Sequence, residues 1–195
     1  HLAKLQPLNL YGWSKHAFDR WALARAAAGQ APPFWAGLKF FNVFGPNEYH
    51  KGDMRSLVAK NFRGIMAGEP VTLFKSHRAD FRDGEQLRDF IYVADCAAVM
   101  LWMLEHRPHS GLFNLGTGQA RSFADLMRAT ARVLGKEAAI EFRDMPEAIR
   151  PNYQYFTQAS MQKLRAAGYT RAFHSLEEGV ADYVTRFLAT DDIYR

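Results

Sequence analysis

The sequence predicts an α/β fold that contains parallel strand pairing. Segments with helical periodicity alternate along the chain with short apolar runs typical of buried strands. Turn-forming residues separate the segments, as at Pro32 and Pro33 and again at Gly45 and Pro46. Because strands alternate with helices, the pattern favours an α/β class over an all-α or all-β one.

Several of the expected elements carry a start or stop signal of their own. The helix expected over 10–28 ends at Gly29, the helix over 54–66 has Gly68 beyond its end, and Ser122 caps the helix over 123–134. Further helices are expected over 94–105, 159–167 and 176–188. Strands are expected over 34–40, 71–74, 89–93, 112–115 and 139–142.

Composition excludes several classes of protein. Of the 195 residues, 48% are hydrophobic and 23% are charged, which is typical of a globular chain rather than a disordered one. No apolar run approaches the ~20 residues of a membrane-spanning helix. The single cysteine, Cys96, cannot form an internal disulfide, so we expect a reducing, cytoplasmic location. The first residues show neither an initiating methionine nor an apolar signal core, so nothing indicates export.

The net charge of +5 indicates a small anionic ligand rather than a nucleic acid. A nucleic-acid surface is usually single-signed, whereas the densest charged stretch here, residues 75–88, mixes both signs. The seven histidines show no spacing typical of a zinc site, and we expect no metal.

Tyr11 and Lys15 form the strongest local signal for chemistry. Positions four apart share one face of a helix, so the phenol and the ammonium point the same way. An ammonium held close to a phenol favours the phenolate, and such a pair can take or return a hydroxyl proton while a hydride leaves the same carbon. The bare pattern alone fits an ordinary amphipathic helix with a surface lysine better.

Three further motifs, taken together with the segment around Tyr11 and Lys15, favour the catalytic interpretation of this pair. The segments 7–15, 41–46, 88–95 and 113–118 read Pro-Leu-Asn-Leu-Tyr-Gly-Trp-Ser-Lys, Phe-Asn-Val-Phe-Gly-Pro, Arg-Asp-Phe-Ile-Tyr-Val-Ala-Asp and Phe-Asn-Leu-Gly-Thr-Gly. Together, in this order, they resemble the extended short-chain dehydrogenase/reductase family that acts on nucleotide sugars. The resemblance implies that Tyr11 is the catalytic acid/base, that Lys15 also holds the nicotinamide ribose, and that 41–46 lies where cofactor meets sugar.

The resemblance also implies the architecture. The chain is expected to hold the C-terminal part of a Rossmann-type doubly wound parallel sheet, together with a smaller α/β substrate-binding domain. Residues 1–50 would belong to the Rossmann cofactor domain and 51–195 mainly to the substrate-binding domain, with 88–115 returning to the Rossmann sheet. The family's glycine-rich loop is expected upstream of His1, so these residues alone are expected to bind NADP poorly and to be inactive.

The Tyr49-His-Lys-Gly52 loop resembles the branch of the family that inverts C6 of an ADP-bound heptose. The hydroxyl occupies different places in the two configurations, so one acid/base cannot easily serve both. The resemblance implies that Lys51 is the second catalytic base and contacts the cofactor. The alternatives are a solvated loop lysine or one that only grips a phosphate.

The resemblance assigns the remaining site residues by position. Val43 would contact the cofactor. The substrate-binding residues would be Asn42, Asp53, Lys60, Phe74, Lys75, Ser76, His77, Arg88 and Tyr153. Asp53 stands where the family has a small hydroxyl residue, and the loop between Phe74 and Arg88 is longer than the family's. For Arg88 and Tyr153, ordinary surface pairing or packing remains the alternative.

The implied cofactor is NADP, with NAD as the alternative, and the implied partner is an ADP-heptose used in lipopolysaccharide synthesis. A homo-oligomer, typically a pentamer, is also implied. Three other functions stay open: a nucleotide-sugar 4-epimerase of the same family, a dehydratase of that family, or a non-catalytic fragment that only holds a nucleotide sugar. Gly116 and Gly118 are not expected to bind a dinucleotide, because Arg121 occupies the third glycine position of that motif.

Overall fold

The computed structural model describes residues 5–190. Its helices are α1 (Leu10–Ala27), α2 (Leu57–Ala67), α3 (Val93–His106), α4 (Phe123–Val133), α5 (Gln162–Ala166) and α6 (Leu176–Tyr183). Its strands are β1 (Ala36–Phe40), β2 (Asn42–Phe44), β3 (Val71–Phe74), β4 (Leu87–Tyr92), β5 (Gly111–Leu115), β6 (Ala120–Ser122) and β7 (Ile140–Arg143). Two 3-10 helices, η2 (Tyr49–Met54) and η3 (Arg150–Asn152), and a π-helix, η4 (Val184–Leu188), complete the elements.

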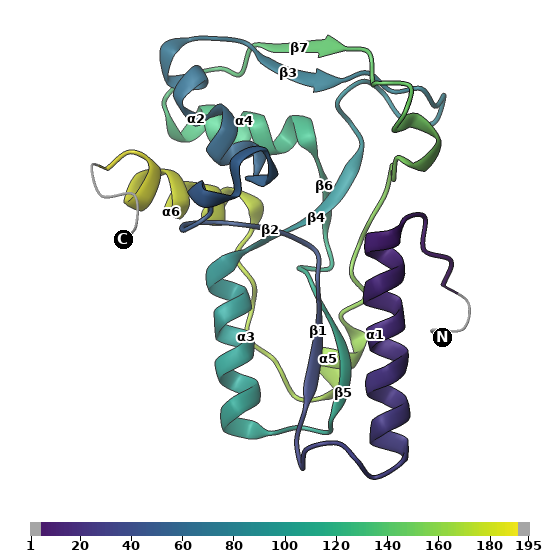
Figure 1. Cartoon of the computed structure of the whole chain (residues 1–195). Helices are drawn as coiled ribbons and strands as arrows, with labels where there is room; N and C mark the ends of the chain where they lie inside the picture. Colours follow the sequence, from purple (N-terminus) through teal and green to yellow (C-terminus); the bar gives the residue numbers. More distant parts are fainter. Residues whose placement is uncertain (1–4, 191–195) are drawn as a thin grey trace.

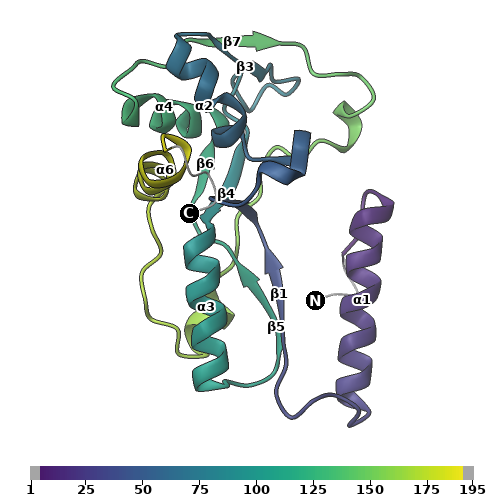
Figure 2. The ribbon, with the colours of Figure 1, turned by 60° about the vertical axis from the view of Figure 1, so that its left-hand side comes forward.

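Parallel strand pairing confirms the expected α/β class. Strand β1 pairs with β5, β2 with β4, and β3 with β7, all in parallel, while β6 runs antiparallel to β4. In both views, α1 and α3 flank the β1–β5 pair, and α2 and α4 lie near β3 and β7 at the other end of the molecule (Figures 1 and 2). No helix between residues 5 and 190 is both long enough and apolar enough to cross a membrane.

Strand β4 separates two hydrophobic clusters. Phe90 and Tyr92 belong to one cluster, which α2, α4 and α6 also line, whereas Ile91 belongs to the other, with Val99 and Phe113. Alternate residues of a strand point to opposite faces, so a single strand supplies both cores. The alternation leaves β4 nearly inaccessible along its length.

Strands β1 and β2 follow each other directly along the chain but belong to different sheets. Residue Phe41 lies between them, and its amide donates a hydrogen bond to the carbonyl of Leu115 in β5. Beyond this point the chain leaves β5 and pairs with β4. The segment therefore connects the region flanked by α1 and α3 to the region built on α2 and α4.

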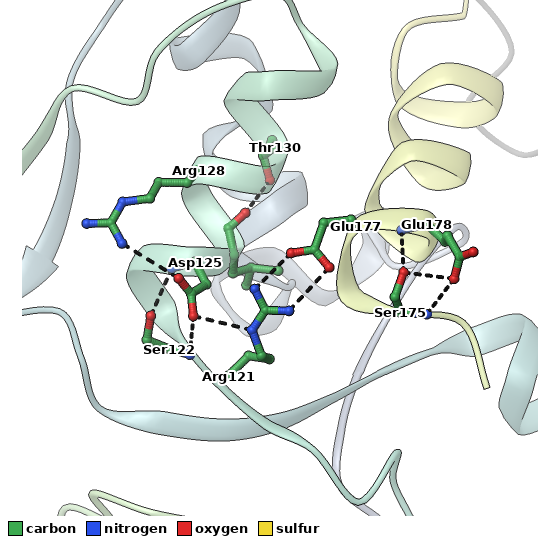
Figure 3. A network of polar contacts seen from close by, with 9 residues as sticks. Arg121, Ser122, Asp125, Arg128, Thr130, Ser175, Glu177 and Glu178 are labelled. Atoms are coloured by element: carbon green, nitrogen blue, oxygen red, sulfur yellow. Dashed lines mark hydrogen bonds and ion pairs between the residues drawn. The ribbon is translucent and has the colours of Figure 1, made fainter. Parts of the chain in front are cut away.

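Polar caps fix where three of the helices begin. Ser122 and Asp125 form a capping box at α4, and Ser175 and Glu178 form one at α6 (Figure 3). Ser56 caps α2 by accepting a hydrogen bond from the amide of Ala59. These caps satisfy amide groups that the first helical turn leaves without partners.

One ion-pair network ties the antiparallel strand β6 to two helices. The Arg121 guanidinium donates two hydrogen bonds to the Glu177 carboxylate, at 2.8 and 3.2 Å, and also contacts Asp125 at 3.3 Å (Figure 3). The network joins β6 to both α4 and α6. It explains why a bulky arginine stands at a position where a dinucleotide-binding loop would need glycine.

The backbone of the turn from Gly116 to Gly118 is hydrogen-bonded to a buried side chain of the same chain. The buried Asp89 carboxylate accepts hydrogen bonds from the Thr117 amide at 2.7 Å and the Gly118 amide at 2.9 Å. A Cβ on Gly116 would lie 2.6 Å from the same carboxylate, so this glycine allows a close approach. Because Asp89 occupies these amides, they do not form a phosphate-binding loop.

Several expected boundaries were wrong. Helix α2 begins at Leu57 rather than at 54, because the preceding residues form the 3-10 helix η2 and Ser56 caps α2. The helix expected over 159–167 spans only Gln162–Ala166, and the one over 176–188 ends as the π-helix η4. The strand expected over 34–40 begins at Ala36, and that over 89–93 spans Leu87–Tyr92. Strands β2 and β6, of three residues each, were not expected.

Candidate functional site

A cavity of about 920 Å³ brings together residues from distant parts of the chain. Tyr11 and Lys15 line it from α1, Arg88 lines it from β4, and Tyr153 from the segment after η3. All four were expected to be functional. Residues far apart in the sequence therefore meet at one concave surface, which is where small-molecule sites are usually found.

Tyr11 and Lys15 lie one turn apart on the same face of α1. The Lys15 ammonium is 5.2 Å from the centroid of the Tyr11 ring, and the Tyr11 side chain is exposed. The helix begins at Leu10 because the Asn9 side chain accepts a hydrogen bond from the Gly12 amide at 2.8 Å. This cap places Tyr11 in the first turn, beside the cavity.

An ion pair with a buried carboxylate sets how α1 faces the cavity. Asp19, four residues after Lys15, is the one buried residue within α1, and it pairs with Lys39 of β1. Both residues line the cavity. Because positions 11, 15 and 19 repeat every four residues, docking Asp19 against β1 also turns Tyr11 and Lys15 towards the cavity. Neither Asp19 nor Lys39 was predicted from the sequence, although the four-residue repeat of positions 11, 15 and 19 is a signal that could have identified Asp19.

Arg88 and Tyr153, which also line the cavity, form a cation–π contact. The Arg88 guanidinium lies 5.3 Å from the Tyr153 ring centroid and 5.5 Å from that of Phe123, and Arg88 is only 9% exposed. Burial lowers the pKa of Arg88 and raises that of Tyr153. An arginine remains charged even so. Lys15, Lys39 and Arg88 line the cavity as cations and Asp19 lines it as an anion, so these four side chains carry a net positive charge, which suits an anionic ligand.

A second cavity, of about 280 Å³, adjoins the first at Tyr153. It is lined by Lys60 from α2 and by Phe74 from β3, both of which were expected to bind substrate. Arg143 of β7 also lines it, with its guanidinium 5.1 Å from the Phe74 ring centroid. Sequence reasoning missed Arg143, because its position beside Phe74 depends on the pairing of β3 with β7.

Asn42 and Val43 line a third cavity, of about 190 Å³. Both belong to β2, and residues 54–57, which run from the end of η2 to the first residue of α2, form another part of the wall. The structure therefore places the two residues at the junction of the sheet and the following loop, but in a different cavity from Tyr11.

Lys51 and Asp53 lie on η2, and both are exposed. Within residues 5–190, neither of them lines the three cavities described above. Gly52, between them, has a φ of 52°, a left-handed conformation that favours glycine. The structure does not bring Lys51 together with Tyr11.

The residues Lys75, Ser76 and His77 lie on the loop after β3. Lys75 forms an ion pair with Asp144 at 3.6 Å, and the His77 amide donates to the Tyr155 hydroxyl at 2.9 Å. The Ser76 amide donates to Asp83 at 2.7 Å. The loop is therefore held by a polar contact within itself, to Asp83, and by two contacts to other segments, at Asp144 and Tyr155.

The residues around Tyr11 and Lys15 fit a nicotinamide nucleotide. A ribose offers hydroxyls to an ammonium, and Lys15 presents its charge into an open cavity beside the Tyr11 phenol. Among residues 5–190, no group of three or more His, Cys, Asp or Glu side chains is placed to hold a metal ion.

Comparisons with known proteins identify the family to which the chain belongs. The model of the NAD dependent epimerase/dehydratase family matches residues 1–116, more than half of the chain. The chain therefore belongs to this family of nucleotide-dependent enzymes. It is 50% identical to the ADP-L-glycero-D-manno-heptose-6-epimerase of Fusobacterium nucleatum, over 99% of this chain and 59% of the relative. The chain thus spans somewhat more than half the length of that relative.

Solved structures show the same fold. The crystal structure of Helicobacter pylori ADP-L-glycero-D-manno-heptose-6-epimerase matches with a TM-score of 0.76 and 29% identity, over 93% of this chain and 52% of that one. Thermus thermophilus UDP-glucose 4-epimerase, in complex with NAD, matches with a TM-score of 0.70 and 26% identity, over 92% of this chain and 54% of that one.

Proposed function

We propose that this chain is part of an epimerase that inverts C6 of the heptose in ADP-D-glycero-D-manno-heptose, giving ADP-L-glycero-D-manno-heptose. The observation that carries the proposal is the shared cavity of Tyr11, Lys15, Arg88 and Tyr153. The identity of 50% to a named 6-epimerase, over almost the whole chain, supports this substrate over others.

Inversion at C6 needs oxidation of the carbinol to a ketone, exposure of the other face, and reduction. NADP or NAD, when bound, supplies the hydride acceptor and donor for this carbon. Tyr11 would remove the C6 hydroxyl proton in one configuration, with the Lys15 charge beside it stabilising the phenolate. Lys15 would also hold the nicotinamide ribose, and Val43 would contact the cofactor.

A second acid/base would serve the other configuration. We assign this role to Lys51, which would also touch the cofactor. Lys51 lies on an exposed loop, so it can reach a bound ligand from the solvent side. For Lys51 to exchange a proton with the same C6 hydroxyl, the loop would have to approach the cavity that contains Tyr11.

The ADP moiety would lie along the two adjoining cavities. Arg88 and Lys60 would bind the diphosphate, and Tyr153 lies at the junction between the cavities. A diphosphate is well matched to a guanidinium, which binds two of its oxygens at once. Asn42, Asp53, Phe74, Lys75, Ser76 and His77 would provide the remaining substrate contacts.

The biological setting follows from the proposed substrate. The product would be a precursor of the lipopolysaccharide core, made in the cytoplasm by a homo-oligomer, typically a pentamer. Residues 1–50 would belong to the cofactor domain and 51–195 mainly to the substrate domain, with 88–115 in the cofactor sheet.

The direct test uses the complete gene product without added cofactor. The protein is incubated with ADP-D-glycero-D-manno-heptose, and inversion at C6 is followed by proton NMR. Inversion would establish both the reaction and a retained cofactor. If C6 does not invert while a UDP- or GDP-hexose is turned over, the proposal is wrong and the function belongs to a 4-epimerase or dehydratase, the class to which the Thermus thermophilus neighbour belongs.

A further inference from the structure

A buried carboxylate lies at the base of the loop that carries Lys51. Glu48 immediately precedes η2 and is only 3% exposed. Its Oε2 accepts a hydrogen bond from the Ser56 amide at 2.7 Å, and its Oε1 accepts one from the Ser56 hydroxyl at 2.6 Å. One side chain thus joins the residue before the loop to the residue that caps α2.

A third donor reaches Glu48 from the other end of the chain. The Tyr183 hydroxyl, in the last turn of α6, donates to Oε1 of Glu48 at 2.9 Å. Tyr183 is fully buried, and burial together with the adjacent Glu48 carboxylate raises its pKa, so the hydroxyl keeps its proton and donates. Helix α6 is therefore joined to the base of the loop through the hydrogen bond between Tyr183 and Glu48.

The carboxylate is held by hydrogen bonds rather than by a cation. Among residues 5–190, no lysine, arginine or histidine forms an ion pair with Glu48. A buried charge is costly unless donors surround it, and three donors converge on this one. Removing the charge leaves these donors without a full set of acceptors, so the geometry of the loop base depends on Glu48.

The loop between these anchors is short and internally bonded. The Lys51 amide donates to the Glu48 carbonyl at 3.0 Å, and Arg55 Nε donates to the Gly52 carbonyl at 2.8 Å. The side chains of residues 50–54 are exposed, whereas Tyr49 is partly buried and packs against the hydrophobic cluster that contains Phe62 and Tyr183. Apolar packing therefore holds the loop at Tyr49, next to Glu48, and this contact together with the hydrogen bonds of Glu48 limits where Lys51 can go.

We propose that Glu48 is a positioning residue: it clasps both ends of the η2 loop, and so restricts the path along which the loop can bring Lys51 to the cavity that contains Tyr11. The part of this inference that concerns catalysis rests on the proposed C6 epimerisation. The part that concerns the loop is structural, and it can be measured without substrate.

The test compares Glu48→Gln, Tyr183→Phe and a control in the complete gene product. The control is Glu105→Gln, because the Glu105 side chain is 72% exposed at the far end of α3. Hydrogen exchange of the amides in residues 49–54 is expected to become at least tenfold faster in Glu48→Gln, less so in Tyr183→Phe, and to stay unchanged in the control. Unchanged exchange in both clasp variants would overturn the proposal.

Catalysis supplies the second measurement. With ADP-D-glycero-D-manno-heptose, Glu48→Gln should lower kcat at least tenfold while KM changes little, since a misplaced acid/base acts on the chemical step. The double variant Glu48→Gln/Lys51→Ala should be no slower than Lys51→Ala alone, because Glu48 acts through Lys51. If the two losses multiply, Glu48 does not act by positioning Lys51.

The two readouts separate the possible failures. Faster exchange in a protein that inverts no C6 would retain the clasp and reject the proposed function. An active protein in which Lys51→Ala costs nothing would reject the positioning role, whatever the loop does. Because Tyr183→Phe removes a single hydroxyl, it keeps the test informative if Glu48→Gln does not fold.

Discussion

The Lys15 ammonium lies 5.2 Å from the centroid of the Tyr11 ring, and both side chains line a cavity shared with Arg88. A third residue of the same helix face, Asp19, is buried against Lys39 of β1. The helix is thus held by its carboxylate while its phenol and ammonium remain open to the cavity. The Tyr11 phenol and the Lys15 ammonium can therefore be replaced one at a time, and each replacement has its own expected effect.

Replacing Tyr11 by phenylalanine should remove the proton acceptor but keep the ring. We expect Tyr11→Phe to lower kcat for C6 inversion by about 10²- to 10⁴-fold, the usual contribution of a general acid/base. Lys15→Met should in addition weaken cofactor binding, measured by fluorescence titration with NADPH. A Tyr11→Phe protein that keeps its activity would exclude the phenol from proton transfer.

Lys51→Ala should distinguish a 6-epimerase from a 4-epimerase. We expect a loss of about 100-fold or more in C6 inversion, because one of the two hydroxyl positions then has no acid/base. Lys136→Ala provides the matched control, since Lys136 is exposed on the loop after α4. Equal C6 inversion by the two variants would show that Lys51 is not the second acid/base, whereas equal turnover of a UDP-hexose in place of C6 inversion would favour the 4-epimerase or dehydratase interpretation.

Arg143 should contribute to binding rather than to chemistry. It lines the second cavity with Lys60 and Phe74, away from Tyr11. We expect Arg143→Ala to raise KM for the ADP-sugar about tenfold with kcat nearly unchanged, the signature of lost uniform binding. Steady-state kinetics over a range of substrate concentrations measures this split, and a fall in kcat without a change in KM would contradict it.

The ion pair between Arg121 and Glu177 predicts a pH-dependent stability. The hydrogen bonds from Arg121 lower the pKa of Glu177 below its ordinary value of 4.5, so the stabilisation is complete above that pH and is lost as the pH falls through the lower, folded-state value. Both side chains are more than a third exposed, so we expect Glu177→Gln to cost only about 0.5–1 kcal/mol at pH 7. Urea unfolding at pH 7 and in steps below 4.5 tests this. A cost that does not shrink in acid would show that the pair is not its source.

Cys96 should be chemically inert in the folded protein. It is 2% exposed, and burial, with a further contribution from Asp95, raises its pKa to about 12. Only a thiolate reacts readily with iodoacetamide, so labelling at pH 8 should be slow in the native protein and fast in urea. Mass spectrometry measures the labelled fraction. Rapid native labelling would show that the α3 region opens.

The elements with strong local signals were predictable from the sequence, whereas the short strands were not. Capping and stop residues such as Ser122 and Gly68 marked helix ends that the structure confirms. Strands β2 and β6 have three residues each, too few for an apolar alternation to appear. Only pairing with β4 defines them as strands.

The part of the candidate site that motif residues form was predictable from the sequence. The part whose residues are placed by strand pairing was not. Tyr11, Lys15, Arg88 and Tyr153 were all expected, and they share a cavity. Arg143 reaches the second cavity because β7 pairs with β3, a contact that local sequence does not encode. Asp19 was overlooked because an acidic residue on a helix usually faces water, whereas this one is buried against Lys39.

Strand β4, whose successive side chains enter opposite hydrophobic clusters, constrains which changes in length the gene can accept. A one-residue insertion or deletion in this strand would exchange the two sets of side chains, moving Ile91 into the place of its neighbours and the aromatic rings of Phe90 and Tyr92 into the other cluster. A point substitution in β4 affects the packing of one cluster, but a one-residue shift in the register of the strand disturbs both clusters at once. Insertions and deletions in related genes should therefore accumulate in the loops around β4 and spare the strand itself.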